Sequence, residues 1–202
     1  MKKIIFLSLL LFLWTVPARA DIEYWKVVEV AGLVETRSPL EPGWKSLSAP
    51  FYMKKGSLLR TGKDAWVDLS LNRQWDGFLR LNADSELEFP ENTPEAVRLR
   101  RGSLFALLEG EAEGDLLSVF SPGATVRLVS GGAAVSTLAS GTRLRVFSET
   151  AEIAGVSQSI EEGWEWDAGN LRRMEFADYD DWQKWIRKSY DRKDKYFLKR
   201  SV

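Results

Sequence analysis

Hydrophobic and polar residues alternate in short runs from Ile22 to about Asp167, and turn-forming residues interrupt the runs roughly every ten positions. Side chains that alternate with a period of two lie on opposite faces of a β-strand. In the stretch 65–71, this places four aliphatic side chains on one face and leaves Trp66, Asp68 and Ser70 on the other. About a dozen such strands favour an all-β fold, either a multi-stranded sandwich or a β-solenoid. Further candidate strands are 78–81, 85–89, 97–100, 103–108, 117–120, 124–129, 133–137, 142–147 and 151–156.

The hydrophobic period changes at the C-terminal end, where the spacing becomes three or four residues. The side chains that share this spacing are Tyr179, Trp182, Ile186, Tyr190, Lys193 and Phe197. Only a helix brings such positions to one side, so we expect a single α-helix over 177–200. Acidic residues stand at its start and basic residues at its end, which suits the helix dipole. A stem, 163–175, precedes the helix and is expected to form a last strand.

The first 20 residues have the features of a secretory signal peptide. Lys2 and Lys3 precede the apolar run 4–16, and Ala18-Arg19-Ala20 is a typical cleavage sequence. An apolar run of this length is short for a permanent membrane helix, which needs about 20 residues. We therefore expect cleavage after Ala20 and a periplasmic or secreted protein.

Three parts follow from these patterns: a signal peptide over 1–20, a β domain over 21–167, and a C-terminal stem with an amphipathic helix over 168–202. Loss of the signal peptide changes the net charge from −1 to −4. Residues 184–200 hold eight basic and two acidic side chains, which leaves about −10 on residues 21–183. An acidic body of this kind does not predict binding to nucleic acid.

The chain contains neither Cys nor His. Their absence excludes thiol nucleophiles, disulfides and Ser-His-Asp arrangements, as well as the commonest metal ligand. The remaining enzymatic possibility is a pair of carboxylates among Glu161, Glu162 and Glu165, in the manner of a glycosidase. Neighbouring residues in a strand point to opposite faces, so this pairing is not favoured. We expect no catalytic residue, no metal and no cofactor.

The order of short motifs along residues 28–163 resembles the FecR domain family. The opening of that domain is similar to Gly32-Leu33-Val34, Gly43-Trp44-Lys45-Ser46-Leu47 and the segment 55–62, which ends in Arg-Thr-Gly. Later steps are similar to Gly77-Phe78-Leu79-Arg80-Leu81, Ser85-Glu86-Leu87, Gly102-Ser103-Leu104 and Phe120-Ser121-Pro122 through Val126. One late step departs from the family pattern, because Val146 to Ile153 has no glycine at its turn.

The resemblance implies a stand-alone, exported FecR-like domain that is not an enzyme. Family members that regulate signalling receive a message from a segment of an outer-membrane receptor, and regulators that cross the membrane carry a cytoplasmic region before this domain. The resemblance therefore implies a protein partner in envelope signalling or assembly, and a binding or scaffolding role.

A second hypothesis is a carbohydrate- or peptidoglycan-binding module that stacks sugars on exposed Trp rings. Trp66, Trp75, Trp164 and Trp166 lie in or beside predicted strands. Such residues more often fill a core, and we favour that role for most of them. Trp66 is the exception, because the alternation places it opposite the aliphatic face.

The C-terminal helix also allows two interpretations. We favour one in which Trp182 and Ile186 pack on the β body while Lys184, Arg187, Lys188 and Arg192 point to solvent or to a partner. In the other, the basic face lies on anionic lipid or cell-wall polymer. The interfacial aromatic side chains would then be Trp185, Tyr190 and Tyr196.

Overall fold

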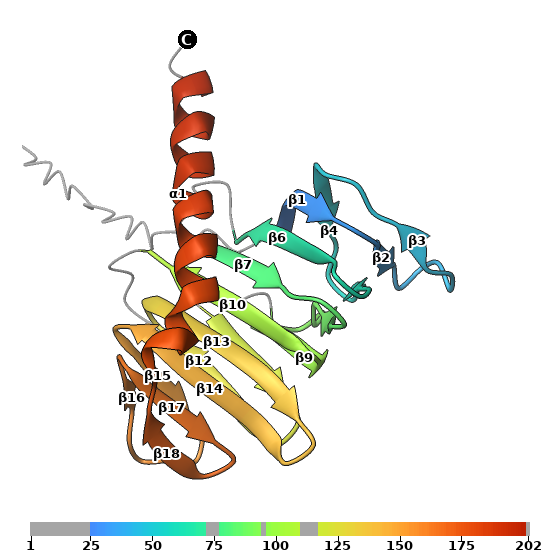
Figure 1. Cartoon of the computed structure of the whole chain (residues 1–202). Helices are drawn as coiled ribbons and strands as arrows, with labels where there is room; N and C mark the ends of the chain where they lie inside the picture. Colours follow the sequence, from blue (N-terminus) through green and yellow to red (C-terminus); the bar gives the residue numbers. More distant parts are fainter. Residues whose placement is uncertain (1–24, 72–76, 94–95, 110–116, 201–202) are drawn as a thin grey trace, which may run out of the picture.

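In the computed structural model, residues 25–71, 77–93, 96–109 and 117–200 are described, with side chains up to Lys193. Over these residues, the chain forms two nine-stranded sheets and one C-terminal helical segment (Figure 1). The predicted all-β fold with a C-terminal helix is therefore confirmed. The signal peptide and Trp75 lie outside the described residues.

The first sheet, sheet A, consists of β18 (Asn170–Arg173), β17 (Trp164–Asp167), β14 (Gly141–Ser148), β13 (Gly131–Leu138), β10 (Ser103–Leu108), β7 (Gly77–Leu81), β6 (Trp66–Ser70), β1 (Trp25–Ala31) and β4 (Phe51–Met53), in spatial order. The second sheet, sheet B, consists of β16 (Ile160–Glu161), β15 (Thr150–Ile153), β12 (Ala124–Leu128), β11 (Leu117–Ser121), β9 (Ala96–Arg101), β8 (Glu86–Glu88), β5 (Leu58–Thr61), β2 (Val34–Arg37) and β3 (Lys45–Ser46). Neighbouring strands run antiparallel, except that β11 runs parallel to β9.

The two sheets share one hydrophobic core, which resolves the choice between sandwich and solenoid in favour of a two-layered sandwich. Val27, Leu79 and Leu144 from sheet A belong to the same buried cluster as Leu59 and Val119 from sheet B. The chain reaches this arrangement by crossing from one sheet to the other after each short run of strands, so that both sheets grow from the same end.

Strand β6 shows how the alternation in sequence becomes two faces. Its aliphatic side chains, together with the flanking Ala65 and Leu71, are buried in the core between the sheets, as predicted. The opposite face is not left to solvent, because Asp68 and Ser70 are also buried. This outer face of sheet A lies under the C-terminal helix.

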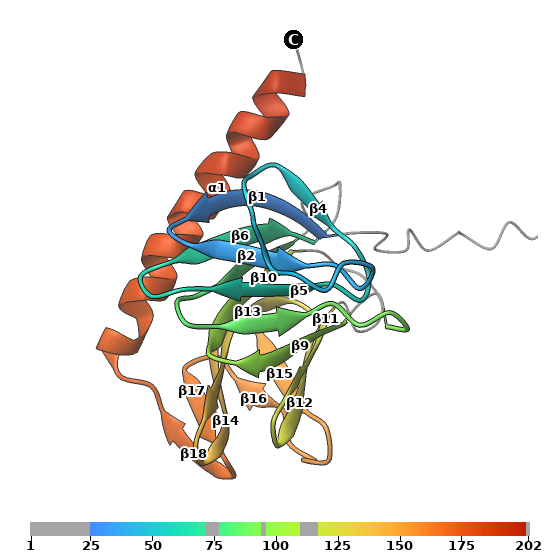
Figure 2. The ribbon, with the colours of Figure 1, turned by 90° about the vertical axis from the view of Figure 1, so that its right-hand side faces the viewer.

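The C-terminal segment begins with a short 3-10 helix, η1 (Phe176–Tyr179), and continues as α1 (Asp180–Arg200). The backbone N–H of Glu175 donates a hydrogen bond of 2.9 Å to the carboxylate of Asp178, which closes the first turn. Both views show α1 lying along the outer face of sheet A, with its C-terminal end extending past the strands (Figures 1 and 2). The expected stem forms strands β17 and β18 in sheet A.

Candidate interaction surface

Helix α1 is held on sheet A by an aromatic cluster. The Trp182 ring stacks on Phe147 with centroids 4.6 Å apart, and the Trp185 ring lies 5.5 Å from Phe105. Ile186 is half-buried against the same cluster. The predicted packing of Trp182 and Ile186 on the body is confirmed. Trp185 is itself buried, so the assignment of this residue as an interfacial aromatic is wrong.

A glycine permits this close packing. At Gly132, in β13, a Cβ atom would lie only 2.1 Å from Cζ2 of Trp182, far inside van der Waals contact. Gly132 therefore leaves the space that the indole of Trp182 fills. On this face of β13, the Trp182 indole from α1 occupies the volume that a side chain at position 132 would need.

A charged cluster lies beside the aromatic cluster, at the contact between α1 and strands β1, β6 and β7. Asp68 is 1% exposed and accepts two hydrogen bonds from Arg80, of 2.6 and 2.8 Å. Nη1 of Arg192 lies 2.5 Å from the same carboxylate, and its Nη2 lies 2.9 Å from Glu29. Lys188 reaches the other oxygen of Glu29 at 2.8 Å. We call these five residues the Asp68 cluster.

The position of Arg192 corrects one prediction. We expected its side chain in solvent or at a partner, but it is only 16% exposed and is paired with a buried carboxylate. The reason is that the outer face of β6 carries the buried Asp68, and the long side chain of Arg192 on α1 supplies a second cation to it beside Arg80. Lys184 and Arg187 are exposed, as expected.

Trp66 belongs to the same region. Its position opposite the aliphatic face of β6 is confirmed, but the ring is only half-exposed. The guanidinium of Arg80 lies 4.1 Å from the ring centroid and the ammonium of Lys188 lies 4.3 Å from it. Both cations therefore lie against the Trp66 ring at distances typical of cation–π contacts. This use of the ring favours a structural role over sugar stacking.

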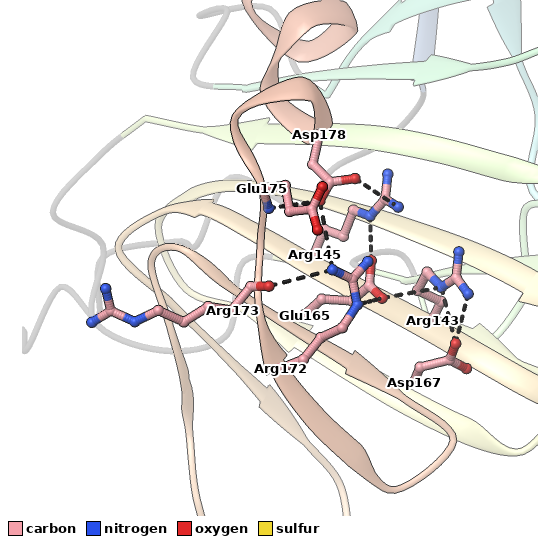
Figure 3. A network of polar contacts seen from close by, with 8 residues as sticks. All are labelled: Arg143, Arg145, Glu165, Asp167, Arg172, Arg173, Glu175 and Asp178. Carbon is pink, nitrogen blue, oxygen red and sulfur yellow. Dashed lines mark hydrogen bonds and ion pairs between the residues drawn. The ribbon is translucent and has the colours of Figure 1, made fainter.

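A second charged cluster joins β14, β17 and β18 to η1, and Figure 3 shows it closely. Glu165 is 1% exposed and accepts hydrogen bonds from Arg145 at 2.5 Å and from Arg172 at 2.9 Å. Asp178, in η1, lies 3.0 Å from Arg145 and 3.8 Å from Arg172. Arg143 approaches Glu165 at 3.5 Å. We call these five residues the Glu165 cluster.

Charge pairing extends from this cluster to the tip of the β17–β18 hairpin. Asp167 accepts a hydrogen bond of 2.6 Å from Arg143, and this bond raises the pKa of the Arg143 guanidinium. Arg145 and Arg172 each contact both Glu165 and Asp178, so these two arginines join strands β14 and β18 to η1 around the buried anion. Trp164 and Trp166 flank it in sequence and point the other way, where they are half-buried against the core.

The third contact of α1 lies near its last described side chains. Lys193 forms an ion pair with Glu109, at the end of β10. Tyr190 is also hydrogen-bonded to Glu109, and burial together with this bond raises the pKa of Tyr190 to about 12. Tyr196 lies beyond the described side chains.

A feature that the sequence patterns did not identify lies at the end of the sandwich formed by β3 and β4. There, a hollow of about 460 Å³ opens between the edges of the two sheets. Thr36, Ser38, Lys45, Leu47, Phe51 and Ser57 are among its lining residues. Two aromatic residues directly after Pro50, followed by Lys54 and Lys55, are the signal in the sequence that could have indicated an exposed edge.

The described residues contain no group of three or more acidic side chains placed to hold a metal ion. Of the helices in the described part, none is both long enough and apolar enough to cross a bilayer.

Comparisons with known proteins give little further information. No family model matches the sequence, and no curated protein matches it. Two crystal structures of a protein from Parabacteroides distasonis, described as a "putative anti-sigma factor", are similar in structure, with a TM-score of 0.47 for each. The identity is 11% and 12%, and each match covers 58% of this chain and 58% of the other. We draw no functional conclusion from similarity at this level, and the resemblance to the FecR domain stays a prediction.

Proposed function

We propose that this protein is an exported, non-enzymatic binding module of the cell envelope, and that it engages a protein partner in envelope signalling or assembly. The observation that carries the proposal is the pair of exposed aromatic side chains on β4, where Phe51 and Tyr52 are 40% and 52% exposed. Exposed aromatic side chains are a common means of binding other proteins. The motifs similar to the FecR domain support the same role.

The non-enzymatic assignment rests on how the acidic side chains are used. Asp68 and Glu165 are the two acidic side chains most completely buried among the described residues, and arginines hold both. A carboxylate held in this way is poorly suited to exchange protons with a substrate. The favoured role of the charged clusters is to hold η1 and α1 on the sandwich.

No observation favours the carbohydrate hypothesis over a protein partner. Each described Trp side chain is buried or half-buried. Trp66 carries cations on its ring, and Trp164 and Trp166 pack against the core. Sugar binding is therefore retained only as one possible outcome of the experiment.

The proposal is tested by photo-crosslinking in the intact envelope. A photoreactive phenylalanine analogue replaces Tyr52 in one variant and Arg187, on the exposed side of α1, in another. We expect an adduct with one defined protein mass at one or both sites. We also expect that the intact mass of the protein recovered from the periplasm or medium corresponds to a chain that begins at Asp21. The absence of protein adducts at both sites would contradict the proposal, and an adduct removed by a peptidoglycan hydrolase would favour the carbohydrate hypothesis. Retention of residues 1–20 in the mass would contradict cleavage after Ala20.

A further inference from the structure

Two kinds of contact hold the C-terminal helical segment on sheet A, and they follow one another along the chain. Up to Ile186 the contacts are apolar, because Tyr179, Trp182, Trp185 and Ile186 pack in one hydrophobic cluster with side chains of the strands. We call these four residues the anchor. The attachment of the first turns is therefore mainly hydrophobic.

From position 188 onward the contacts are ionic. Three basic side chains pair with carboxylates of the β body, namely Lys188 and Arg192 with Glu29, Arg192 with Asp68, and Lys193 with Glu109. Within the sequence 188–193, Tyr190 is the one aromatic side chain, and it is 44% exposed. We call the segment 188–193 the strap. It has little apolar surface to bury on the sheet, so charge supplies most of its attachment.

The contacts of Lys188 show what kind of group the sheet receives beneath the strap. Its ammonium lies 4.3 Å from the ring centroid of Trp66 and 2.8 Å from Oε1 of Glu29. An aromatic ring beside a carboxylate is an arrangement that binds cationic side chains. Asp68 and Glu109 receive the other two cations. We call Glu29, Trp66, Asp68 and Glu109 the covered face, which suits basic side chains and now holds those of the strap.

The pairing of Arg192 lacks well-aligned hydrogen bonds. Its Nη1 and Nη2 lie at ion-pair distance from Asp68 and Glu29. All three nitrogen atoms of the side chain are buried, yet none of them makes a hydrogen bond of good geometry within the described part of the chain. A buried charge without such bonds is poorly compensated for the water that it has lost. Lifting the strap returns water to Arg192 and Asp68, and this hydration offsets the attraction that is broken.

Tyr52, on β4, lies on the same side of sheet A as the covered face. It is opposite Lys26 in β1, and Lys26 is opposite Ser70 in β6. Residues opposite one another in neighbouring strands share a face, and Ser70 is on the outer face together with Asp68. A partner that contacts the exposed ring of Tyr52 can therefore extend to the covered face along one side of the sheet.

We propose that the strap is a releasable cover, and that a basic segment of the partner protein binds the covered face when the strap lifts. The anchor stays on sheet A while the strap opens. Cations of the partner then take the places of Lys188, Arg192 and Lys193, so the strap acts as an autoinhibitory contact. This inference rests on the proposed function, because it states where and by what chemistry the partner binds. Charge complementarity selects a basic partner.

Opening of the strap is measured through Ser189, because the chain has no Cys of its own. Ser189 is 0% exposed, and Ser189→Cys places a thiol there with little change in volume. The rate at which this thiol reacts with a maleimide reports how often the strap lifts. Val135→Cys, in the core between the sheets, reports global unfolding. We expect the thiol of Ser189→Cys to react at least about tenfold faster than that of Val135→Cys.

The contribution of charge is tested by reversing it on the strap. Lys188→Glu and Lys193→Glu, each combined with Ser189→Cys, should accelerate the reaction by about fivefold, because like charges then face Glu29 and Glu109. Arg187→Glu is the matched control, since Arg187 is exposed on the same helix, and it should leave the rate unchanged. Salt at about 0.5 M should accelerate the reaction of Ser189→Cys alone, because it screens the exposed ion pairs.

The chemistry of the partner is tested with two synthetic peptides added to Ser189→Cys. One has the sequence of residues 187–200, and the other carries Glu at the positions of Lys188, Arg192 and Lys193. We expect the basic peptide at about 1 mM to accelerate the thiol reaction saturably, because it binds the covered face and keeps the strap open. The second peptide should have no effect.

Variants of the covered face separate binding from stability. Glu29→Gln and Glu109→Gln should raise the rate without peptide, because each removes an ion pair of the strap. They should also weaken the effect of the basic peptide, which a purely structural role of these residues would not do. Circular dichroism establishes that each variant is folded. The salt dependence of Ser189→Cys keeps the test valid if a Glu variant of the strap is destabilised.

Three results would overturn the inference: equal reaction rates of Ser189→Cys and Val135→Cys, unchanged rates in Lys188→Glu and Lys193→Glu, or equal effects of the two peptides. A protein adduct at Tyr52 or Arg187, combined with any of these results, would leave the proposed function intact and exclude the covered face as its site. Failure of crosslinking at both positions would instead count against the proposed function.

Discussion

Asp68 is the buried carboxylate that meets cations from both sheet A and α1. Arg80 approaches it from the neighbouring strand and Arg192 approaches it from the helix, and all three side chains have little exposure to solvent. Removing one member of a buried ion pair leaves the others desolvated and without compensation, which costs about 3 to 5 kcal/mol.

Asp68→Asn should therefore lower the free energy of unfolding by about 3 to 5 kcal/mol, measured by urea denaturation. Glu29→Gln is the matched control, because Glu29 is one-third exposed and pairs with Arg192 and Lys188 at the margin of the cluster. Its loss should cost about 1 kcal/mol or less. Equal effects of the two variants would show that Asp68 has no special place in the cluster.

Tyr190 provides a residue-scale prediction at alkaline pH. Its pKa is raised from 10.0 to about 12 by burial and by its hydrogen bond to Glu109. The folded state therefore keeps this proton at a pH where the unfolded chain has lost it. The stabilising contribution is complete below about pH 10 and is lost as the pH rises toward 12.

Tyr190→Phe removes this titration. We expect the difference in unfolding free energy between the unmodified protein and Tyr190→Phe to shrink between pH 10 and 12. Tyrosinate absorbance should show one late-titrating phenol in the unmodified protein and none in the variant at that position. A difference in stability that stays constant over this range would contradict the assignment.

At the scale of elements, the packing of α1 depends on the space that Gly132 leaves. A methyl group at this position would lie 2.1 Å from the Trp182 ring, so the ring and the helix turn that carries it would have to move. Overpacking of this kind costs about 1 to 3 kcal/mol.

Gly132→Ala should lower the melting temperature and shift the tryptophan fluorescence, because Trp182 is displaced from Phe147. Gly43→Ala is the control, since a Cβ atom there meets nothing within 4 Å. Its effect on the free energy of unfolding should stay within about 0.5 kcal/mol. If the two variants melted alike, the close approach of Trp182 to β13 would not limit the docking of the helix.

The elements also show what the sequence could and could not predict. Alternation identified the core face of β6 because a period of two fixes which side chains share a face. The same alternation could not say what covers the other face, and so Arg192 was wrongly placed in solvent or at a partner. Its partner, Asp68, lies far away in sequence, and only the packing of α1 on sheet A brings them together.

The hollow was missed for a related reason. Its lining combines β2, β3, β4 and the residues around Lys54, and these meet only because β3 and β4 are the last strands of different sheets. Periodicity predicts strands but not their spatial order. Trp66 illustrates an intermediate case, because its face was predicted correctly while one of the two cations at its ring, Lys188, comes from the helix.

At the scale of the whole molecule, α1 serves as the cover of the outer face of sheet A. Phe78, Leu107 and Phe147 are buried there beneath Trp182 and Trp185. Loss of one buried Trp typically costs about 3 to 5 kcal/mol, and an ordinary domain has about 5 to 15 kcal/mol in total. Helix and sandwich should therefore behave as one cooperative unit.

A chain that ends at Arg173 lacks η1 and α1, and we expect it to bind a hydrophobic dye strongly, to aggregate, and to lose cooperative thermal unfolding. A chain that ends at Lys193 keeps Trp182, Trp185 and the ion pairs that Arg192 and Lys193 form with the β body, so it should melt close to the full-length protein. The two truncations distinguish the contribution to stability of the part of α1 that covers sheet A from that of the segment that extends past the strands. Only the first truncation removes the aromatic side chains of α1 from sheet A. A monomeric, cooperatively folded chain ending at Arg173 would show that the sandwich is an independent domain and that α1 is free to serve a partner.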